Sequence, residues 1–191
     1  MKDILRLGII LFLITGICTG LLGGIYQVTK PIIEENNAKT QMAAMQALLT
    51  DADDFVAVEG ASEELVAAIF VAKAGANQVG YVAKVTPLGY GGTIELLVAF
   101  DAQCTVQGIK ILSHAETPGF GANAEKPTFT EQFKAKKAPL SVTKVTPDDD
   151  EVQAITGATI TSTAVTEGVN AAATYIKAHS TECGIYNEKT T

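Results

Sequence analysis

Tryptophan is absent from the 191-residue sequence, and cysteine and histidine are scarce. The three cysteines, Cys18, Cys104 and Cys183, lie too far apart in the sequence to form a CxxC pair, which argues against iron–sulfur and structural zinc sites. The two histidines, His114 and His179, are too few and too separated for haem or a dinuclear metal centre. We therefore expect no metal site, and the sequence leaves open whether Cys104 and Cys183 form a disulfide.

Positive charge is also sparse. The 14 Lys and Arg residues are outnumbered by 21 Asp and Glu residues, the net charge is −7, and no basic cluster is present. Proteins that bind nucleic acid need a basic surface to neutralise phosphates, so the sequence argues against such a partner. The acidic balance is typical of a soluble surface.

Residues 7–29 contain no formal charge. As a helix with a rise of about 1.5 Å per residue, this segment reaches roughly 35 Å, enough to cross a bilayer. Lys2 and Arg6 could instead begin a cleaved signal peptide, but the apolar run is longer than a usual signal core and no A-x-A-like site follows it. We expect residues 1–30 to be an uncleaved, single-pass anchor in the cell (inner) membrane.

The charges that flank this segment indicate its orientation. Lys2 and Arg6 precede it, whereas Lys30 is soon followed by Glu34 and Glu35. The positive-inside rule then predicts a cytoplasmic N-terminus and a domain on the outer, periplasmic face.

Three glycines inside the anchor, Gly16, Gly20 and Gly24, are spaced four apart and share one helix face. Small residues on one face allow close helix packing in lipid, although glycine is also simply tolerated in membrane helices. We expect the anchor to contact lipid and other membrane subunits.

The rest of the chain predicts an α+β fold, with helices packed on an antiparallel sheet. Helix-forming residues dominate 32–49 and predict a stalk helix in the region 31–55, with Pro31 in its first turn. The remaining residues, 56–191, form the expected extracytoplasmic domain. Alternating or continuous apolar patterns predict three antiparallel strands at 80–86, 94–100 and 105–112, whereas 63–73 fits either a strand or a short helix.

Two helices are predicted further along. Residues 128–134 form a short one, and residues 162–179 form a longer one that Ser162 would cap. Its buried stripe would consist of Val165, Val169, Ala172 and Ile176.

The segment 154–162, AITGATITS, contains more hydroxyl groups than a turn and helix cap require. Thr156, Thr159, Thr161 and Ser162 surround Gly157 and Ala158 just before a predicted helix. Because a helix N-terminus has free N–H groups and a positive dipole end, the pattern indicates either a phosphate site or an ordinary capped turn.

Two other segments are candidates for binding. SHAETPGFG at 113–121 places His114 and Glu116 in a Pro–Gly loop, and LGYGG at 88–92 places Tyr90 between glycines, where its ring could lie against a planar ligand. Surface turns would explain both almost as well.

Together, these segments resemble the FMN-binding domain family. TGATITS is similar to its flavinylation motif, Ser/Thr–Gly–Ala–Thr; HAETPGFG, followed by Phe129 and Phe133, is similar to its His-x-Glu-Thr-Pro-Gly loop; and GYGG is similar to its glycine-rich turn. The order, the spacing and the single N-terminal span agree over essentially the whole chain. Within the family the sequence most resembles the G subunits of the Rnf complexes, the ion-translocating ferredoxin:NAD⁺ oxidoreductases. The C subunits of the Na⁺-translocating NADH:quinone reductases are the alternative.

This resemblance implies FMN joined through its phosphate to the hydroxyl of Thr159. It further implies that Thr156, Gly157, Ala158 and Thr161 shape the phosphate site, that His114, Glu116, Thr117 and Gly119 line the flavin cleft, and that Leu88 and Tyr90 lie near the ring. Gln153 departs from the pattern, which often has an acidic residue at that position.

The resemblance also implies a separate flavin transferase that uses FAD and Mg²⁺. Threonine is a poor nucleophile without an activating group, and the sequence places no evident base beside Thr159.

The expected function is electron relay within a membrane-bound redox complex that transports ions, without independent turnover. No nucleophile–base pair or dinucleotide fingerprint indicates catalysis on a metabolite. Two other classes remain open: a non-redox assembly subunit, and a membrane-tethered flavin reductase with a soluble substrate of its own.

Overall fold

The computed structural model describes residues 2–179, which belong to two compact units, Met1–Gln41 and Met42–Thr191. Cys104 is buried, and Cys183 lies outside the described residues.

The first unit is helical throughout its described residues. Helix α1 (Lys2–Leu48) begins there and is the one described helix that is long and apolar enough to cross a membrane. Its apolar side chains between residues 4 and 33 are exposed, as expected for a helix whose natural surroundings are lipid.

Pro31 lies inside α1 rather than in the first turn of a new helix. Proline removes one backbone hydrogen bond from a helix and clashes with the preceding turn, but these effects are local and a long helix can continue past it. At the other end α1 stops at Leu48 and strand β1 (Asp54–Ala57) begins at Asp54, so the helix ends before the expected stalk region does.

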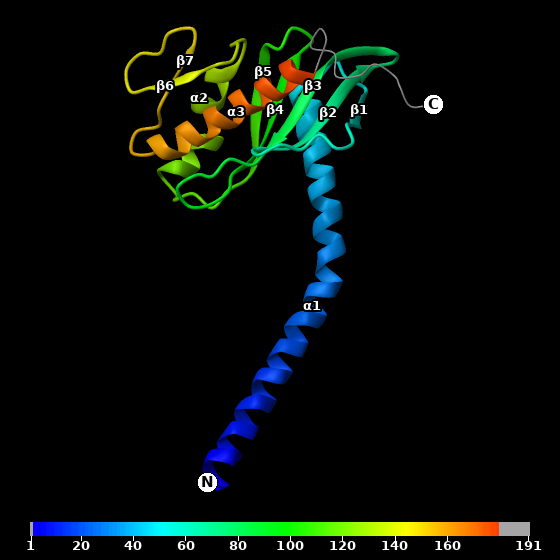
Figure 1. Ribbon diagram of the computed structural model, residues 1–191, viewed down its shortest axis with the longest axis vertical. Coiled ribbons are helices and arrows are strands. Elements are labelled where there is room, and N and C mark those ends of the chain that lie inside the picture. The colour runs from blue at the N-terminus through cyan, green and yellow to red at the C-terminus, as the bar shows by residue number, and fades with distance from the viewer. Residues whose placement is uncertain (1, 180–191) are drawn as a thin grey trace. The chain divides into compact units, whose positions relative to one another are not determined.

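The second unit is built on a five-stranded antiparallel meander with the order β1-β2-β3-β4-β5 (Figure 1). After β1 come β2 (Val66–Ala74), β3 (Asn77–Val85), β4 (Glu95–Asp101) and β5 (Val106–Ser113). The predicted antiparallel α+β architecture is confirmed, and the ambiguous segment 63–73 contributes a strand. Every residue from Leu96 to Phe100 is fully buried, which explains the continuous apolar run of β4.

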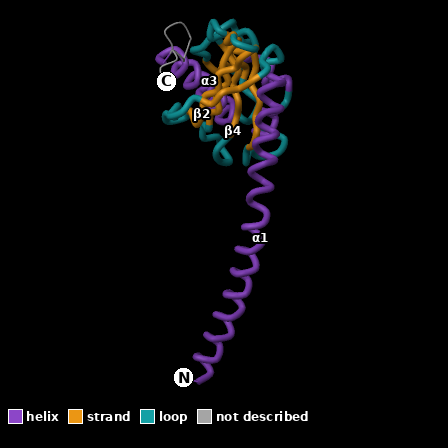
Figure 2. Tube along the Cα trace, turned by 90° about the vertical axis from the view of Figure 1, so that its right-hand side faces the viewer, coloured by secondary structure: helices purple, strands orange, loops and turns teal. Residues whose placement is uncertain are grey.

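Helix α3 (Thr159–His179) packs on one face of this sheet, as Figures 1 and 2 show from two directions. The predicted stripe of Val165, Val169, Ala172 and Ile176 is fully buried in this core. Phe129 and Phe133 also enter this core and contact each other edge to face at a centroid distance of 5.4 Å.

Short elements connect the sheet to α3. The 3₁₀ helices η1 (Gly121–Glu125) and η2 (Glu131–Phe133) flank α2 (Pro127–Thr130), in the region of the predicted short helix. Strands β6 (Ser141–Thr143) and β7 (Glu151–Gln153) then form a parallel pair, from which the chain leads into α3.

The opposite face of the sheet is covered by the last turns of α1 and the residues that follow them. Met45 and Leu49 pack there with Phe55 and Leu97 in a second hydrophobic cluster. Gly108 of β5 permits this packing, because a Cβ at that position would lie 3.0 Å from Leu48 Cδ2.

Two methionines near the end of α1 provide a matched test of this packing. Met45 is 2% exposed and Met42 is 41% exposed. We expect Met45→Ala to lower the free energy of unfolding by about 2–3 kcal/mol because it leaves a cavity, and Met42→Ala to change it by less than about 0.5 kcal/mol. Denaturant unfolding of the full chain in detergent, followed by circular dichroism, measures both. Equal losses would contradict a core that includes the end of α1.

Candidate functional site

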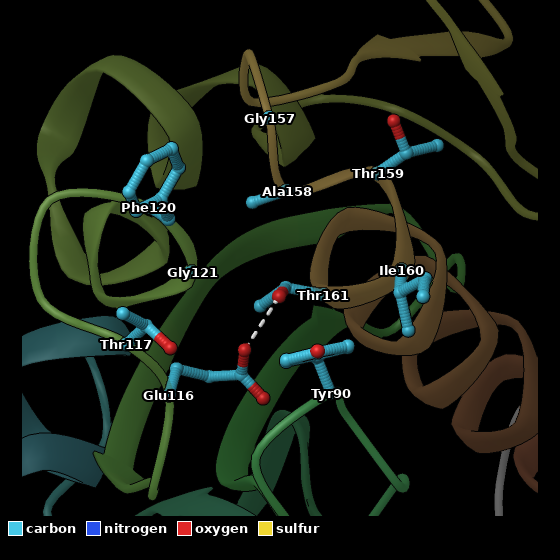
Figure 3. A pocket seen from close by; sticks show the side chains of 10 residues that line it. All are labelled: Tyr90, Glu116, Thr117, Phe120, Gly121, Gly157, Ala158, Thr159, Ile160 and Thr161. Carbon is cyan, nitrogen blue, oxygen red and sulfur yellow. Dashed lines mark hydrogen bonds between the residues drawn. The ribbon is translucent and has the colours of Figure 1, made fainter.

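The three sequence segments with unexplained polar and glycine residues meet beside the first turn of α3. A cavity of about 560 Å³ lies between them, a volume typical of cofactor sites (Figure 3). Its lining residues are Tyr90, Glu116, Thr117, Phe120, Gly121, Gly157, Ala158, Thr159, Ile160 and Thr161.

Glu116 joins the three segments. Its side chain is 6% exposed, and each carboxylate oxygen accepts one hydrogen bond. The N–H of Gly91 donates to Oε1 at 3.0 Å, and the hydroxyl of Thr161, itself 1% exposed, donates to Oε2 at 2.7 Å. One side chain thus ties the glycine-rich turn and the start of α3 to its own loop.

Glycines surround this carboxylate because nothing larger fits. A Cβ at Gly89 would collide with Oε1 of Glu116, and a Cβ at Gly121 would collide with Oε2. A Cβ at Gly91 would collide with the carbonyl oxygen of Ala115. The glycine pattern of these motifs is therefore explained by close approach to the 115–116 segment.

His114 supports Glu116 from outside the cavity. The backbone N–H of Glu116 donates to His114 Nδ1 at 3.1 Å, so Nδ1 acts as an acceptor. The other ring nitrogen, Nε2, lies 3.2 Å from Glu125 Oε1 in η1 and can donate its proton there. The imidazole thus connects the Glu116 loop to η1 and does not line the cavity.

Helix α3 begins at Thr159, three residues before the predicted start. Ser162 is fully buried and does not cap the helix. Its Oγ instead accepts a hydrogen bond from the N–H of Ile155 and donates one to the carbonyl of Ala158, both at 3.0 Å. The hydroxyl therefore holds the preceding loop closed from inside the first turn.

The first turn of α3 lacks an internal cap. Ala158 precedes it and has no side-chain acceptor, and the first N–H to find a carbonyl is that of Ser162. No acceptor within residues 2–179 takes a hydrogen bond from the N–H groups of Thr159, Ile160 or Thr161. These N–H groups and the helix dipole suit an anionic group such as a phosphate.

The side chain of Thr159 is available at this position. It is exposed, makes no hydrogen bond within the described part of the chain, and points away from Glu116 in Figure 3. Gly157, with φ of +76°, adopts the left-handed conformation that turns the chain into the helix, and a Cβ there would lie 2.9 Å from the Phe120 ring.

A side-chain clamp holds the strand that leads to this loop. Gln132 Oε1 accepts a hydrogen bond from the N–H of Gln153 at 2.7 Å, and its Nε2 donates to the carbonyl of Gln153 at 3.4 Å. The side-chain amide of Gln132 thus bonds to both backbone polar groups of Gln153, as the backbone of a neighbouring strand would.

The rim of the cavity is apolar. Tyr90 and Phe120 are 73% and 54% exposed, and Ile160, which also lines the cavity, is 56% exposed. Exposed aromatic side chains around a cavity suit a planar, partly apolar ligand. A ring at this rim and a phosphate at the start of α3 together match the chemical parts of FMN, so the residues present fit that cofactor.

Of the residues predicted from the sequence, the cavity brings together Tyr90, Glu116, Thr117, Gly157, Ala158, Thr159 and Thr161. Thr156 and Gly119 lie instead on a neighbouring depression that Gln153 also lines. Leu88 is 73% exposed and forms an isolated bridge with Thr93 outside the lining. Phe120, Gly121 and Ile160 were not predicted, although they stand inside the PGFG and TGATIT patterns.

Known proteins match this chain over both its parts. Residues 89–174 match the FMN-binding domain family, and residues 1–48 match the RnfG N-terminal region.

The chain is 42% identical over 153 residues to the G subunit of the proton-translocating ferredoxin:NAD(+) oxidoreductase complex of Clostridium ljungdahlii, with 80% of each chain covered. It is 38% identical over 186 residues to the G subunit of the Na(+)-translocating complex of Acetobacterium woodii, covering 88% of this chain and 89% of that one. A crystal structure of the C subunit of the Na(+)-translocating NADH-quinone reductase from Parabacteroides distasonis has a TM-score of 0.49 and 30% identity, covering 58% of this chain and 61% of that one.

Ser162 and its neighbour Thr163 allow a test of whether the buried hydroxyl of Ser162 holds the loop before α3. Ser162→Ala removes the acceptor for the N–H of Ile155, and we expect a loss of about 1–3 kcal/mol in the free energy of unfolding. The side chain of Thr163 makes no hydrogen bond within residues 2–179. Thr163→Ala should therefore change the free energy of unfolding by no more than about 0.5 kcal/mol. Denaturant unfolding of both variants measures the difference. Similar values would show that the buried hydroxyl does not hold the loop.

Proposed function

Because this chain belongs to the RnfG family, the G subunits of the ion-translocating ferredoxin:NAD(+) oxidoreductases, we propose that it relays electrons through FMN esterified to Thr159. The chain is an electron-transfer subunit of such a complex and carries an FMN-binding domain. Bound FMN supplies the redox chemistry, since its ring accepts electrons and passes them on. The observation that carries the covalent proposal is the exposed hydroxyl of Thr159 at an uncapped helix N-terminus beside the cavity.

The start of α3 suits a phosphodiester. A phosphate joined to the Thr159 hydroxyl would keep one negative charge close to the N–H groups of the first turn. The favourable interaction with the helix dipole is worth about 1 kcal/mol. Gly157 and Ala158 leave the approach to this turn clear of large side chains.

The remaining lining residues would hold the flavin ring. Tyr90, Phe120 and Ile160 offer apolar surface at the rim and exclude water from one part of the cavity. Their exposure leaves part of a bound ring open to the outside, which suits transfer of electrons to another protein better than enclosure of a small substrate. We therefore expect no turnover by the isolated chain.

Attachment requires a second protein. A threonine hydroxyl must be activated by a base or a metal, and the buried carboxylate at this site is already engaged by Thr161 and Gly91. Thr159 projects away from that carboxylate (Figure 3), so it is placed for an external flavin transferase that, with Mg²⁺, breaks the pyrophosphate bond of FAD, joins the FMN part to the hydroxyl and releases AMP. The family's sequence pattern often has an acidic residue at the position of Gln153. The backbone of Gln153 is held by a hydrogen bond to the side chain of Gln132.

The apolar N-terminal helix associates the chain with a membrane, and we propose a specific topology for it. Lys2 and Arg6 favour a cytoplasmic N-terminus, which places the FMN domain on the outer face. Lipid and the other subunits of the complex would contact α1, with Gly16, Gly20 and Gly24 providing a face for close helix packing.

The covalent link is tested by the intact mass of the full chain, produced with and without a co-expressed flavin transferase. We expect a gain equal to FMN less one water that depends on the transferase. Thr159→Ala should abolish the gain, whereas Thr159→Ser should retain it because the hydroxyl is kept.

Thr163→Ala is the matched control, because it removes a hydroxyl from the same helix, four residues further on and outside the cavity lining. An unmodified wild-type mass beside an active transferase would overturn covalent attachment and favour a non-redox assembly subunit. A modified Thr159→Ala variant would show that FMN is attached elsewhere.

A further inference from the structure

Resting on the proposed function, we propose a positioning role for Glu116: its carboxylate fixes the shape of the flavin cavity, and its charge lowers the reduction potential of the flavin bound there. Glu116 belongs to the cavity lining, yet both of its oxygens bond to protein groups. It can therefore act on the cofactor through geometry and electrostatics without a covalent role.

The geometric part follows from the two hydrogen bonds. Gly91 lies in the turn that carries Tyr90, and Thr161 lies in the turn of α3 that begins with Thr159. These two segments are far apart in the sequence, and Glu116 is bonded to both. Loss of the carboxylate would free the ring-binding turn and the attachment turn from each other.

The electrostatic part follows from burial without a counter-ion. Glu116 is 6% exposed, and no ion pair within residues 2–179 includes it. The lining contains no other carboxylate and no Lys, Arg or His among the described residues. Both hydrogen-bond partners, the backbone N–H of Gly91 and the hydroxyl of Thr161, are neutral donors.

A charge in such a site acts strongly on its neighbours, because the surroundings screen it less than water does. Electrons taken up from a redox partner add negative charge to the flavin. An ionised carboxylate in the same cavity opposes that gain and so lowers the reduction potential.

Glutamine separates the two parts of the proposal. In Glu116→Gln the amide oxygen can accept from the N–H of Gly91, and the amide nitrogen can donate to the hydroxyl oxygen of Thr161. Both ties are kept and only the charge is removed. Glu116→Ala removes the ties as well as the charge.

The experiment uses the full chain in detergent, loaded by a co-expressed flavin transferase. Spectroelectrochemical titration gives the flavin potential, intact mass gives the fraction modified, and visible circular dichroism reports how firmly the ring is held. Glu167→Gln is the control, because it removes one exposed negative charge from α3 outside the cavity lining.

We expect Glu116→Gln to become fully modified, to keep the flavin dichroism and to shift the potential to more positive values. Glu167→Gln should leave all three unchanged. Glu116→Ala should show a loss of flavin dichroism and a lower modified fraction. A merely structural role would not move the potential of the glutamine variant.

Equal potentials for wild type, Glu116→Gln and Glu167→Gln would overturn the electrostatic part. Unchanged dichroism and modification in Glu116→Ala would overturn the geometric part. A wild-type chain that takes up no flavin beside an active transferase would instead overturn the proposed function, and this inference with it.

Discussion

The two hydrogen bonds accepted by Glu116 join parts of the chain that are otherwise separate. They connect the turn at 88–92, the loop after β5 and the first turn of α3, and they do so in a space where three glycines leave no room for side chains. A buried carboxylate left without partners would cost several kcal/mol, so these donors and the glycines around them form one unit. This unit ties together the segments that line the cavity.

The sheet makes this unit possible. Strand β4 is fully buried along most of its length, and β5 pairs with it before delivering the loop that contains Glu116. The apolar stripe of α3 packs in the core on one face of this sheet. This packing holds the uncapped start of the helix beside the loop that contains Glu116. The first turn keeps its N–H groups free for a phosphate because Ala158, which precedes the helix, has no side-chain acceptor to cap them.

Much of this arrangement could be predicted from the sequence, and the exceptions have physical reasons. Strands β3, β4 and β5 and the stripe of α3 follow from apolar patterns that burial requires. Strand β1 begins inside the region expected for the stalk helix, and the pattern at 63–73 did not distinguish β2 from a short helix. The start of α3 was predicted three residues late because Ser162 has the chemistry of a cap and Ala158 does not. Strands β6 and β7 are three residues each, too short to show a period. His114 lies outside the cavity because its ring accepts a hydrogen bond from the backbone N–H of Glu116. The spacing of residues in the sequence does not predict this bond.

The most direct measurement is an experimental structure of the full chain after flavin attachment. We predict a phosphate bonded to Thr159 Oγ1 and held by the N–H groups of the first turn of α3. We also predict a flavin ring between Tyr90 and Phe120, and Glu116 still bonded to Gly91 and Thr161. A ring lying outside this cavity, or a Glu116 carboxylate turned away from both partners, would contradict the proposed function and the proposed role of Glu116.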